Sequence, residues 1–273
     1  MNIPFVKAHG ALNDFLLTWT HDVPETEDLA ALARAICHRN SGVGADGWML
    51  VRPGSGDAHG AIQLINSDGS RSEISGNGTR CAAALLVREG HAPDGHVTVR
   101  TGAGNRELEV KHRDGNRFLF EMNMGRATFP GEVRSTLPLS EGSSEVTILN
   151  VGNPQCAVFV DDFDFDWRTL GAVIERHAHF PNRTNVSFVR AVSPDRLEVR
   201  FFERGAGETQ SSGTGSTGAA AAARARGLLT GPDATVDTPA GPLTIAWRNE
   251  DIYLTGPAEL TAQGLFYWTA RSK

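Results

Sequence analysis

The sequence has few cysteines, no long apolar run and no excess of positive charge. Its three cysteines, Cys37, Cys81 and Cys156, are widely spaced and form no C-x-x-C pair, so they indicate neither a disulfide framework nor a zinc site. No apolar run reaches the ~18 residues of a membrane-spanning helix. A net charge of −6 is not typical of nucleic-acid-binding proteins, which carry a basic stripe. We therefore expect neither nucleic acid nor a membrane as a partner.

Residues 1–9 lack the basic start and apolar stretch of a signal peptide, so we expect a cytoplasmic protein. The length of 273 residues suggests two domains, because a domain typically has about 150 residues. Thirty glycines predict frequent tight turns or close backbone approaches.

An internal repeat supports the two-domain prediction. A shift of 137 positions places residues 75–84 (SGNGTRCAAA) over residues 212–221 (SGTGSTGAAA). The same shift places residues 98–104 (TVRTGAG) over residues 235–241 (TVDTPAG) without a gap. Such a register predicts two copies of one α/β unit. We place the domains at residues 1–122 and 123–261.

Each copy has the composition of one helix and several short strands. Residues 82–89 and 219–226 are rich in helix formers, and a glycine, Gly90 or Gly227, ends each helix. Strands are expected at 108–110, 118–120, 146–151, 157–160 and 197–202. The predicted class is α/β (α+β), with two pseudo-symmetric domains, each a curved, mostly antiparallel sheet wrapped around a central helix.

A serine followed by Gly-x-Gly precedes each expected helix, at Ser75 and at Ser212. Small residues leave the first backbone N–H groups of a helix uncovered, and these groups bind anions such as a carboxylate. Two such sites related by pseudo-symmetry would suit chemistry at one carbon approached from both sides. The alternative interpretation is that both serines are simple N-caps.

The segments before these motifs, residues 66–73 and 203–210, are polar. Glu203 and Arg204 follow an apolar strand, where a carboxylate and a guanidinium could bind the ammonium and carboxylate groups of a substrate. The alternatives are a solvated turn for the first segment and a surface ion pair for the second.

Together these motifs resemble the two active-site signatures of the diaminopimelate epimerase family. The first runs from Asn66 through Asp68-Gly69-Ser70 to the SGNG motif at residues 75–78, and the second from Glu203 through Thr209 to the SGTG motif at residues 212–215. Shorter matches are residues 9–10, 13–15, 42–47, 151–154 and 184–186. The resemblance runs from about residue 3 to about residue 265.

The resemblance implies two similar α/β domains, with a C-terminal segment from about residue 262 to 273 returning to the first. It implies a catalytic pair at their interface, here Ser75 and Ser212, that epimerises LL- and meso-diaminopimelate for lysine and peptidoglycan precursor synthesis. It implies no cofactor and no metal, and a homodimer by analogy. The substrate-binding residues implied are Asn13, Asn66, Gly76, Asn77, Asn153, Asn185, Glu203, Arg204, Gly213 and Thr214.

Three departures from the family pattern bear on activity. Serines stand where the family has its two catalytic cysteines, Gln155 stands where a histidine follows Asn-Pro, and Gly47 replaces a glutamine. A cysteine thiol has a pKa near 8.5 that helix starts lower, whereas a serine hydroxyl begins several units higher. A helix dipole contributes only ~0.3–2 kcal/mol, so an unassisted serine pair should transfer protons poorly. His9 and His38 are the candidate assisting bases.

Three hypotheses follow. The chain is an epimerase by lineage, whose serines are either natural or substitutions that arrest turnover. Alternatively, it is a sibling isomerase or hydro-lyase acting on another amino or hydroxy acid. The third hypothesis is an amino acid binding protein without catalysis.

Overall fold

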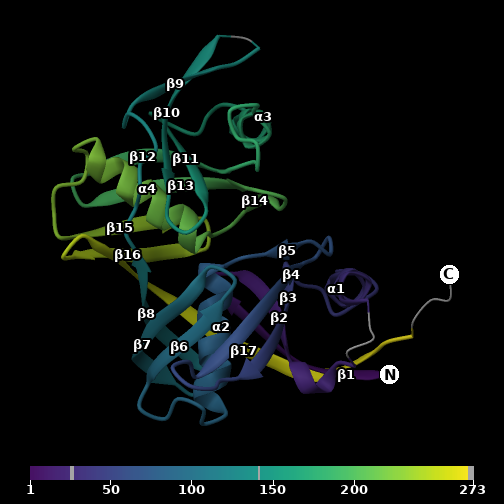
Figure 1. Ribbon diagram of the computed structural model, residues 1–273. Coiled ribbons are helices and arrows are strands. Elements are labelled where there is room, and N and C mark those ends of the chain that lie inside the picture. The colour runs from purple at the N-terminus through teal and green to yellow at the C-terminus, as the bar shows by residue number, and fades with distance from the viewer. Residues whose placement is uncertain (25–27, 141, 270–273) are drawn as a thin grey trace. The chain divides into compact units, whose positions relative to one another are not determined.

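The computed structural model describes residues 1–24, 28–140 and 142–269, which divide into two compact units (Figure 1). Unit 1 contains Met1–Met122 and the chain from Pro257 onward, and unit 2 contains Asn123–Gly256. The sequence placed the return to the first unit at about residue 262, and the structure places it at Pro257. The last strand, β17, is continuous from Asp251 to Tyr267, so no turn residue marks this change in the sequence.

The elements of unit 1 follow the order β1 (Asn2–Gly10), β2 (Asn13–Trp19), η1 (Thr20–Asp22), α1 (Leu29–Cys37), β3 (Gly47–Pro53), β4 (Gly60–Asn66), β5 (Arg71–Ser72), α2 (Gly76–Arg88), β6 (His96–Thr101), β7 (Gly104–Asp114) and β8 (Arg117–Gly125). Unit 2 has β9 (Ser135–Pro138), β10 (Ser143–Asn150), β11 (Pro154–Phe159), α3 (Trp167–Glu175), β12 (Asn185–Ser193), β13 (Arg196–Glu203), β14 (Gly207–Thr209), α4 (Gly213–Ala225), β15 (Asp233–Thr238), β16 (Gly241–Arg248) and β17. Strands β8 and β17 each have residues in both units.

Both units use the same strand pairings. In unit 1, β1–β2, β3–β4 and β6–β7 are antiparallel, whereas β2–β3 and β4–β6 are parallel. In unit 2, β10–β11, β12–β13 and β15–β16 are antiparallel, whereas β11–β12 and β13–β15 are parallel. Each parallel pair is joined through a helix, as parallel strands require a long crossover. The predicted mostly antiparallel sheet is confirmed.

The repeat seen in the sequence also holds in the strand register. In unit 1, Leu64 pairs with Ser72, and the positions 137 residues later, Phe201 and Thr209, pair in unit 2. Similarly, the pair Gly60–Val99 recurs as Leu197–Val236. The two units are therefore copies of one supersecondary arrangement.

Helices α2 and α4 begin at Gly76 and Gly213, earlier than the predicted starts at residues 82 and 219. The Gly-x-Gly motifs therefore belong to the first helical turn. A Cβ on Gly78 would lie 2.0 Å from Met49 Cε, and one on Gly215 would lie 2.8 Å from Phe201 Cδ1. Glycine is needed at these two positions for close packing against the sheet. Helix propensity alone predicts a turn there, because glycine is a poor helix former.

In each unit the helices cover both faces of its part of the 17-stranded sheet that the described residues form. Helix α2 contacts β1, β2, β3, β4, β6 and β7, and α4 contacts β10, β11, β12, β13, β15 and β16 (Figure 1). Helix α1 packs on β3 and β4 over a separate core cluster, and α3 packs on β12 and β13 in the same way. The residues of α2 up to Leu86 and of α4 up to Ala223 are buried, as expected for a central helix. No helix of the described residues is long and apolar enough to cross a membrane.

Candidate active site

Ser75 is the N-cap of helix α2. Its backbone is extended, and its hydroxyl accepts a hydrogen bond from Gly78 N at 3.1 Å. Its carbonyl oxygen accepts from the Thr79 hydroxyl at 2.7 Å. The N-cap interpretation is thus confirmed for the hydroxyl oxygen. Among the described residues, no acceptor is found for the proton of this hydroxyl.

Asn77, in the first turn of α2, belongs to a directed chain of hydrogen bonds. Arg80 Nη2 donates to Asn77 Oδ1 at 2.6 Å, and Asn77 Nδ2 donates to Asn13 Oδ1 at 3.2 Å. Asn13 Nδ2 donates in turn to Asp46 Oδ2 at 2.7 Å. This chain brings two of the predicted substrate-binding residues, Asn13 and Asn77, together at the start of the helix.

The far end of this chain is anchored by charge. Arg39 contacts Asp46 at 2.7 Å and Asp14 at 2.8 Å, and Lys7 contacts Asp14 at 3.1 Å. Burial raises the pKa of Asp14, but its hydrogen bonds to Arg39 and Lys7 outweigh burial and leave that pKa lowered. The loop carrying Asn13 is therefore held by ionised groups at neutral pH.

Asn66, at the end of β4, forms a local turn instead of contacting Ser75. Its side chain donates to Ser70 Oγ at 3.0 Å, and Asp68 accepts from both the Ser70 backbone and its hydroxyl. This arrangement is the solvated turn that was the alternative interpretation of residues 66–73. It leaves a role for Asn66 in substrate binding untested.

Ser212 caps helix α4 and also donates a hydrogen bond to a carboxylate. Its hydroxyl oxygen accepts from Gly215 N at 3.0 Å, and its proton is directed to Glu203 Oε1 at 2.7 Å. The other carboxylate oxygen of Glu203 accepts from the Thr209 hydroxyl at 2.7 Å. Ser212 is buried, at 3% exposed, and Glu203 is half-buried, so solvent reaches this hydrogen bond only from the glutamate side.

Thr214, in the first turn of α4, is held by two amides. Asn153 Nδ2 donates to Thr214 Oγ1 at 3.3 Å, and Gln155 Nε2 donates to Asn153 Oδ1 at 2.7 Å. Gln155 is 2% exposed, and its Oε1 has no partner among the described residues. Gly218 of α4 packs against it, since a Cβ there would lie 3.0 Å from Gln155 Cγ. Gln155, at the position where the resemblance implies a histidine, thus packs directly against helix α4.

Asn185 and Arg204 are brought together at the ends of β12 and β13. Arg204 N donates to Asn185 Oδ1 at 3.0 Å, and Asn185 Nδ2 donates to the Pro154 carbonyl at 3.0 Å. The buried carboxylate of Glu175 accepts from Gly205 N and forms ion pairs with Arg183 and Arg176. Asn185 and Glu175 therefore hold the turn that follows Glu203 in place.

Neither candidate histidine contacts Ser75 in the structure. His9 Nε2 lies 3.9 Å from Glu259, and the His38 ring nitrogen Nδ1 is bound by Ser41 and by the Asn40 backbone. Cys81 is fully buried, as expected, and burial raises its pKa to about 12. It therefore cannot replace a catalytic thiolate at Ser75.

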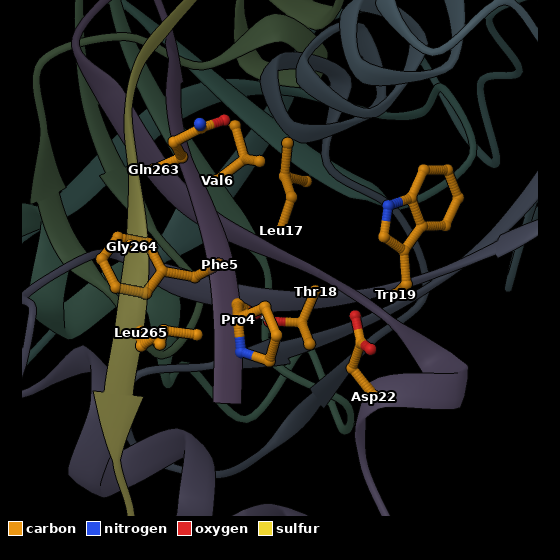
Figure 2. A pocket seen from close by; sticks show the side chains of 10 residues that line it. All are labelled: Pro4, Phe5, Val6, Leu17, Thr18, Trp19, Asp22, Gln263, Gly264 and Leu265. Carbon is orange, nitrogen blue, oxygen red and sulfur yellow. Dashed lines mark hydrogen bonds between the residues drawn. The ribbon is translucent and has the colours of Figure 1, made fainter. Parts of the chain in front are cut away.

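A cavity of about 350 Å³ in unit 1 lies elsewhere (Figure 2). Its lining is mostly apolar, with Phe5, Leu17, Trp19 and Leu265 as the main side chains. The Thr18 hydroxyl already donates a hydrogen bond to the Pro4 carbonyl and accepts one from the Trp48 indole. None of the predicted site residues lines this cavity, so it supplies no acid and base pair for the expected chemistry.

Three residues that hold the candidate site in place have no role assigned from the sequence. Arg80 lies in the repeated segment 75–84, where its spacing indicates no function. Gln155 is a departure from the family pattern, and Glu175 closes an ordinary amphipathic helix. No group of three His, Cys, Asp or Glu side chains suited to a metal ion occurs among the described residues.

Comparison with known proteins identifies the family. A family model described as "Diaminopimelate epimerase" matches residues 5–130 and 147–261. A diaminopimelate epimerase of Pelotomaculum thermopropionicum is 38% identical over 275 residues, which cover 95% of this chain and 97% of the relative. One from Synechococcus elongatus is 37% identical over 276 residues, which cover 94% of this chain and 96% of the relative.

Solved structures show the same fold at lower identity. A hydroxyproline epimerase from Agrobacterium vitis, with bound trans-4-hydroxy-L-proline, is 17% identical with a TM-score of 0.72, covering 97% of this chain and 90% of its own. A probable proline racemase from Agrobacterium radiobacter is 17% identical with a TM-score of 0.75, covering 96% and 92%. These structures bear on the fold, and the closer relatives bear on the family. The chain belongs to the diaminopimelate epimerase family.

Proposed function

We propose that this chain binds diaminopimelate and inverts its α-carbon without a cofactor, with Ser75 and Ser212 as the two proton-transfer residues. The observation that carries this assignment is the hydrogen bond from the Ser212 hydroxyl to Glu203 Oε1, at 2.7 Å. A simple N-cap needs only the acceptor role of the hydroxyl oxygen. A carboxylate on the hydroxyl proton is an additional feature, which supports a role in proton transfer.

The helix starts supply the groups that such a reaction needs. Removing an α-proton leaves an electron pair that spreads into the neighbouring carboxylate, so donors aimed at that carboxylate lower the barrier. We assign this role to the starts of α2 and α4, at Gly76, Asn77, Gly213 and Thr214. The remaining predicted residues, which would bind the distal amino acid group, are Asn13, Asn66, Asn153, Asn185, Glu203 and Arg204. Glu203 then has a second role as the partner of Ser212.

The two serines are prepared for opposite tasks. Ser212 can take the α-proton on its oxygen while its own proton moves to Glu203, so that it acts as the base. The proton of Ser75 has no acceptor among the described residues, so Ser75 acts as the acid and donates this proton to the opposite face of the carbon. Solvent then reprotonates the Ser75 oxygen, and Glu203 returns its proton to solvent. In the reverse direction the same steps run backwards, so Ser75 takes the α-proton without the help of a carboxylate. Because the equilibrium between the two isomers fixes the ratio of the forward and reverse rates, we expect this weaker site to limit both directions.

Serine limits the rate in both directions. A carboxylate is a weak base toward a serine hydroxyl, which holds its proton far more tightly than a thiol does. The hydrogen bond orients Ser212 but does not convert it to an alkoxide. The proposed activity is therefore slow with serines at both positions, whether they are natural or introduced.

The test is deuterium incorporation at the α-carbon of LL-diaminopimelate in heavy water, followed by mass spectrometry. We expect the Ser75→Cys, Ser212→Cys double variant to exchange on the order of a thousandfold faster than the parent chain. Each single variant should stay well below the double variant, because both faces of the carbon need a proton carrier. Binding of diaminopimelate without exchange in the double variant would contradict the catalytic assignment. Turnover of another amino or hydroxy acid in its place would favour a sibling isomerase.

Two further expectations accompany this proposal. All three cysteines are free and buried, which supports a reducing compartment such as the cytoplasm. A homodimer is expected by analogy with the family. Light scattering in solution would test it by measuring the molar mass.

A further inference from the structure

Arg80 is a fully buried cation at the start of helix α2. It is 0% exposed, and no carboxylate pairs with it among the described residues. Its Nε donates to the Pro257 carbonyl at 3.1 Å and its Nη2 donates to Asn77 Oδ1 at 2.6 Å. Its Nη1 is buried without a partner in that same part of the chain. Buried charges in proteins are normally paired, so this arrangement requires an explanation.

The charge survives at neutral pH. Burial lowers the pKa of Arg80 to about 10, because a desolvated guanidinium loses the hydration of its charge. At pH 7 the group therefore remains protonated. Burial also raises the pKa of the neighbouring Cys81 thiol to about 12, so this thiol is neutral and supplies no compensating charge. The positive charge of Arg80 is therefore not compensated by any described side chain of unit 1.

The position of Arg80 connects this charge to the assigned carboxylate donors. Arg80 lies in the second turn of α2, behind the N–H groups of Gly76 and Asn77. Its bond to Asn77 Oδ1 orients that amide so that Nδ2 points to Asn13. The equivalent position in unit 2 is Thr217, which is neutral and only donates to the Gly213 carbonyl at 2.8 Å. The cation is therefore a feature of one helix start and not of the repeated scaffold.

We propose that Arg80 is the counter-charge and positioning residue for the carboxylate bound at the start of α2. It orients Asn77 and supplies the positive charge that the bound anion neutralises. This inference rests on the proposed function, since it takes the ligand to be the α-carboxylate of diaminopimelate. Unit charges on the order of 7 Å apart, at an effective dielectric constant of about 20, change a binding constant roughly 50-fold.

The experiment is calorimetric titration of the parent chain with LL-diaminopimelate, which needs no turnover. Arg80→Met keeps the length of the side chain and removes its charge, and we expect it to weaken binding about 10- to 100-fold. Arg80→Lys keeps the charge without the planar fork, and we expect binding within several-fold of the parent at pH 6. The matched control is Arg226→Met, which removes another buried arginine, one that pairs with Glu145. This control should bind as the parent does.

A pH series separates charge from packing. A buried lysine has a lowered pKa, so binding by Arg80→Lys should weaken as the pH rises from 6 to 8.5 while the parent stays constant. Circular dichroism confirms that each variant is folded. If the parent binds and Arg80→Met binds equally well, Arg80 is not the counter-charge. Equal losses in both Arg80 variants and the Arg226 control, without pH dependence, would also overturn it. A parent chain that does not bind diaminopimelate contradicts the proposed function itself, and the inference with it.

Discussion

The two units share a scaffold but differ in charge at their helix starts. At the position where unit 2 has Glu203, unit 1 has Asn66, and where unit 1 has Arg80, unit 2 has Thr217. Unit 2 thus offers a carboxylate to its serine, and unit 1 places a cation behind its serine. The repeated backbone therefore carries a carboxylate beside one N-cap serine and a buried cation in the helix that follows the other. Duplication supplies the geometry, and single substitutions at equivalent positions supply the chemical difference.

The largest expected effect concerns the carboxylate of unit 2. In the double-cysteine background, Glu203→Gln should lower α-proton exchange about 100-fold, because it removes the acceptor for the proton of residue 212. The matched change in unit 1 is Asn66→Asp, which adds a carboxylate at the equivalent position and should slow exchange far less. Deuterium incorporation measures both. Equal losses would show that the two helix starts are not specialised.

The alkaline stability of the chain offers a second comparison. Burial raises the pKa of Cys37, Cys81 and Cys156 to about 12, well above the ordinary value of a cysteine thiol near 9. The unfolded chain loses these protons near pH 9 while the folded chain retains them, so stability falls as the pH rises above about 9. At pH 10 the loss is about 1.4 kcal/mol for each thiol. Two of the three thiols lie in unit 1, which should therefore be the more sensitive unit.

Thermal unfolding at pH 8 and pH 10 tests this expectation. Replacing Cys37 by alanine should reduce the alkaline loss by about a third, since the three thiols contribute alike. Native protein should also react slowly with a thiol reagent. Rapid reaction of all three cysteines before unfolding would contradict their burial.

Much of the fold could be predicted because the repeat is ungapped, and the register of Leu64–Ser72 against Phe201–Thr209 preserves it. Ser75 and Ser212 could be placed at helix starts for the same reason. The true start of each helix could not, because Gly78 and Gly215 reflect contacts with Met49 and Phe201 that are distant in sequence. Local propensity counts such glycines against a helix.

Partners of the site residues were the harder part. The distance between Ser212 and Glu203 depends on how β13, β14 and the start of α4 fold back on one another, and no spacing rule gives it. The role proposed for Arg80 depends on there being no carboxylate paired with it in the described part of the chain, which only three-dimensional packing reveals. Sequence therefore indicates which residues matter and leaves their pairing open.

Removing each capping hydroxyl compares the two helix starts directly. Ser75→Ala should cost about 1 kcal/mol, the usual loss for an N-cap. Ser212→Ala should cost about 2 kcal/mol, because it also leaves an oxygen of Glu203 without its hydrogen-bond donor. Chemical denaturation with urea measures both free energies of unfolding. Equal costs would mean that the bond to Glu203 contributes nothing to stability.

The smallest expected effect concerns Gln155. Gln155→Met keeps the volume beside Gly218 and removes both the donor to Asn153 and the unpartnered Oε1. The lost hydrogen bond and the relieved buried oxygen oppose each other, so the free energy of unfolding should change by less than about 1 kcal/mol. Substrate binding should still weaken several-fold, because Asn153 would no longer hold Thr214 in one orientation. A large loss of stability with unchanged affinity would instead make Gln155 a packing residue. The hydrogen bonds that lead from Gln155 through Asn153 to Thr214 would then have no part in binding.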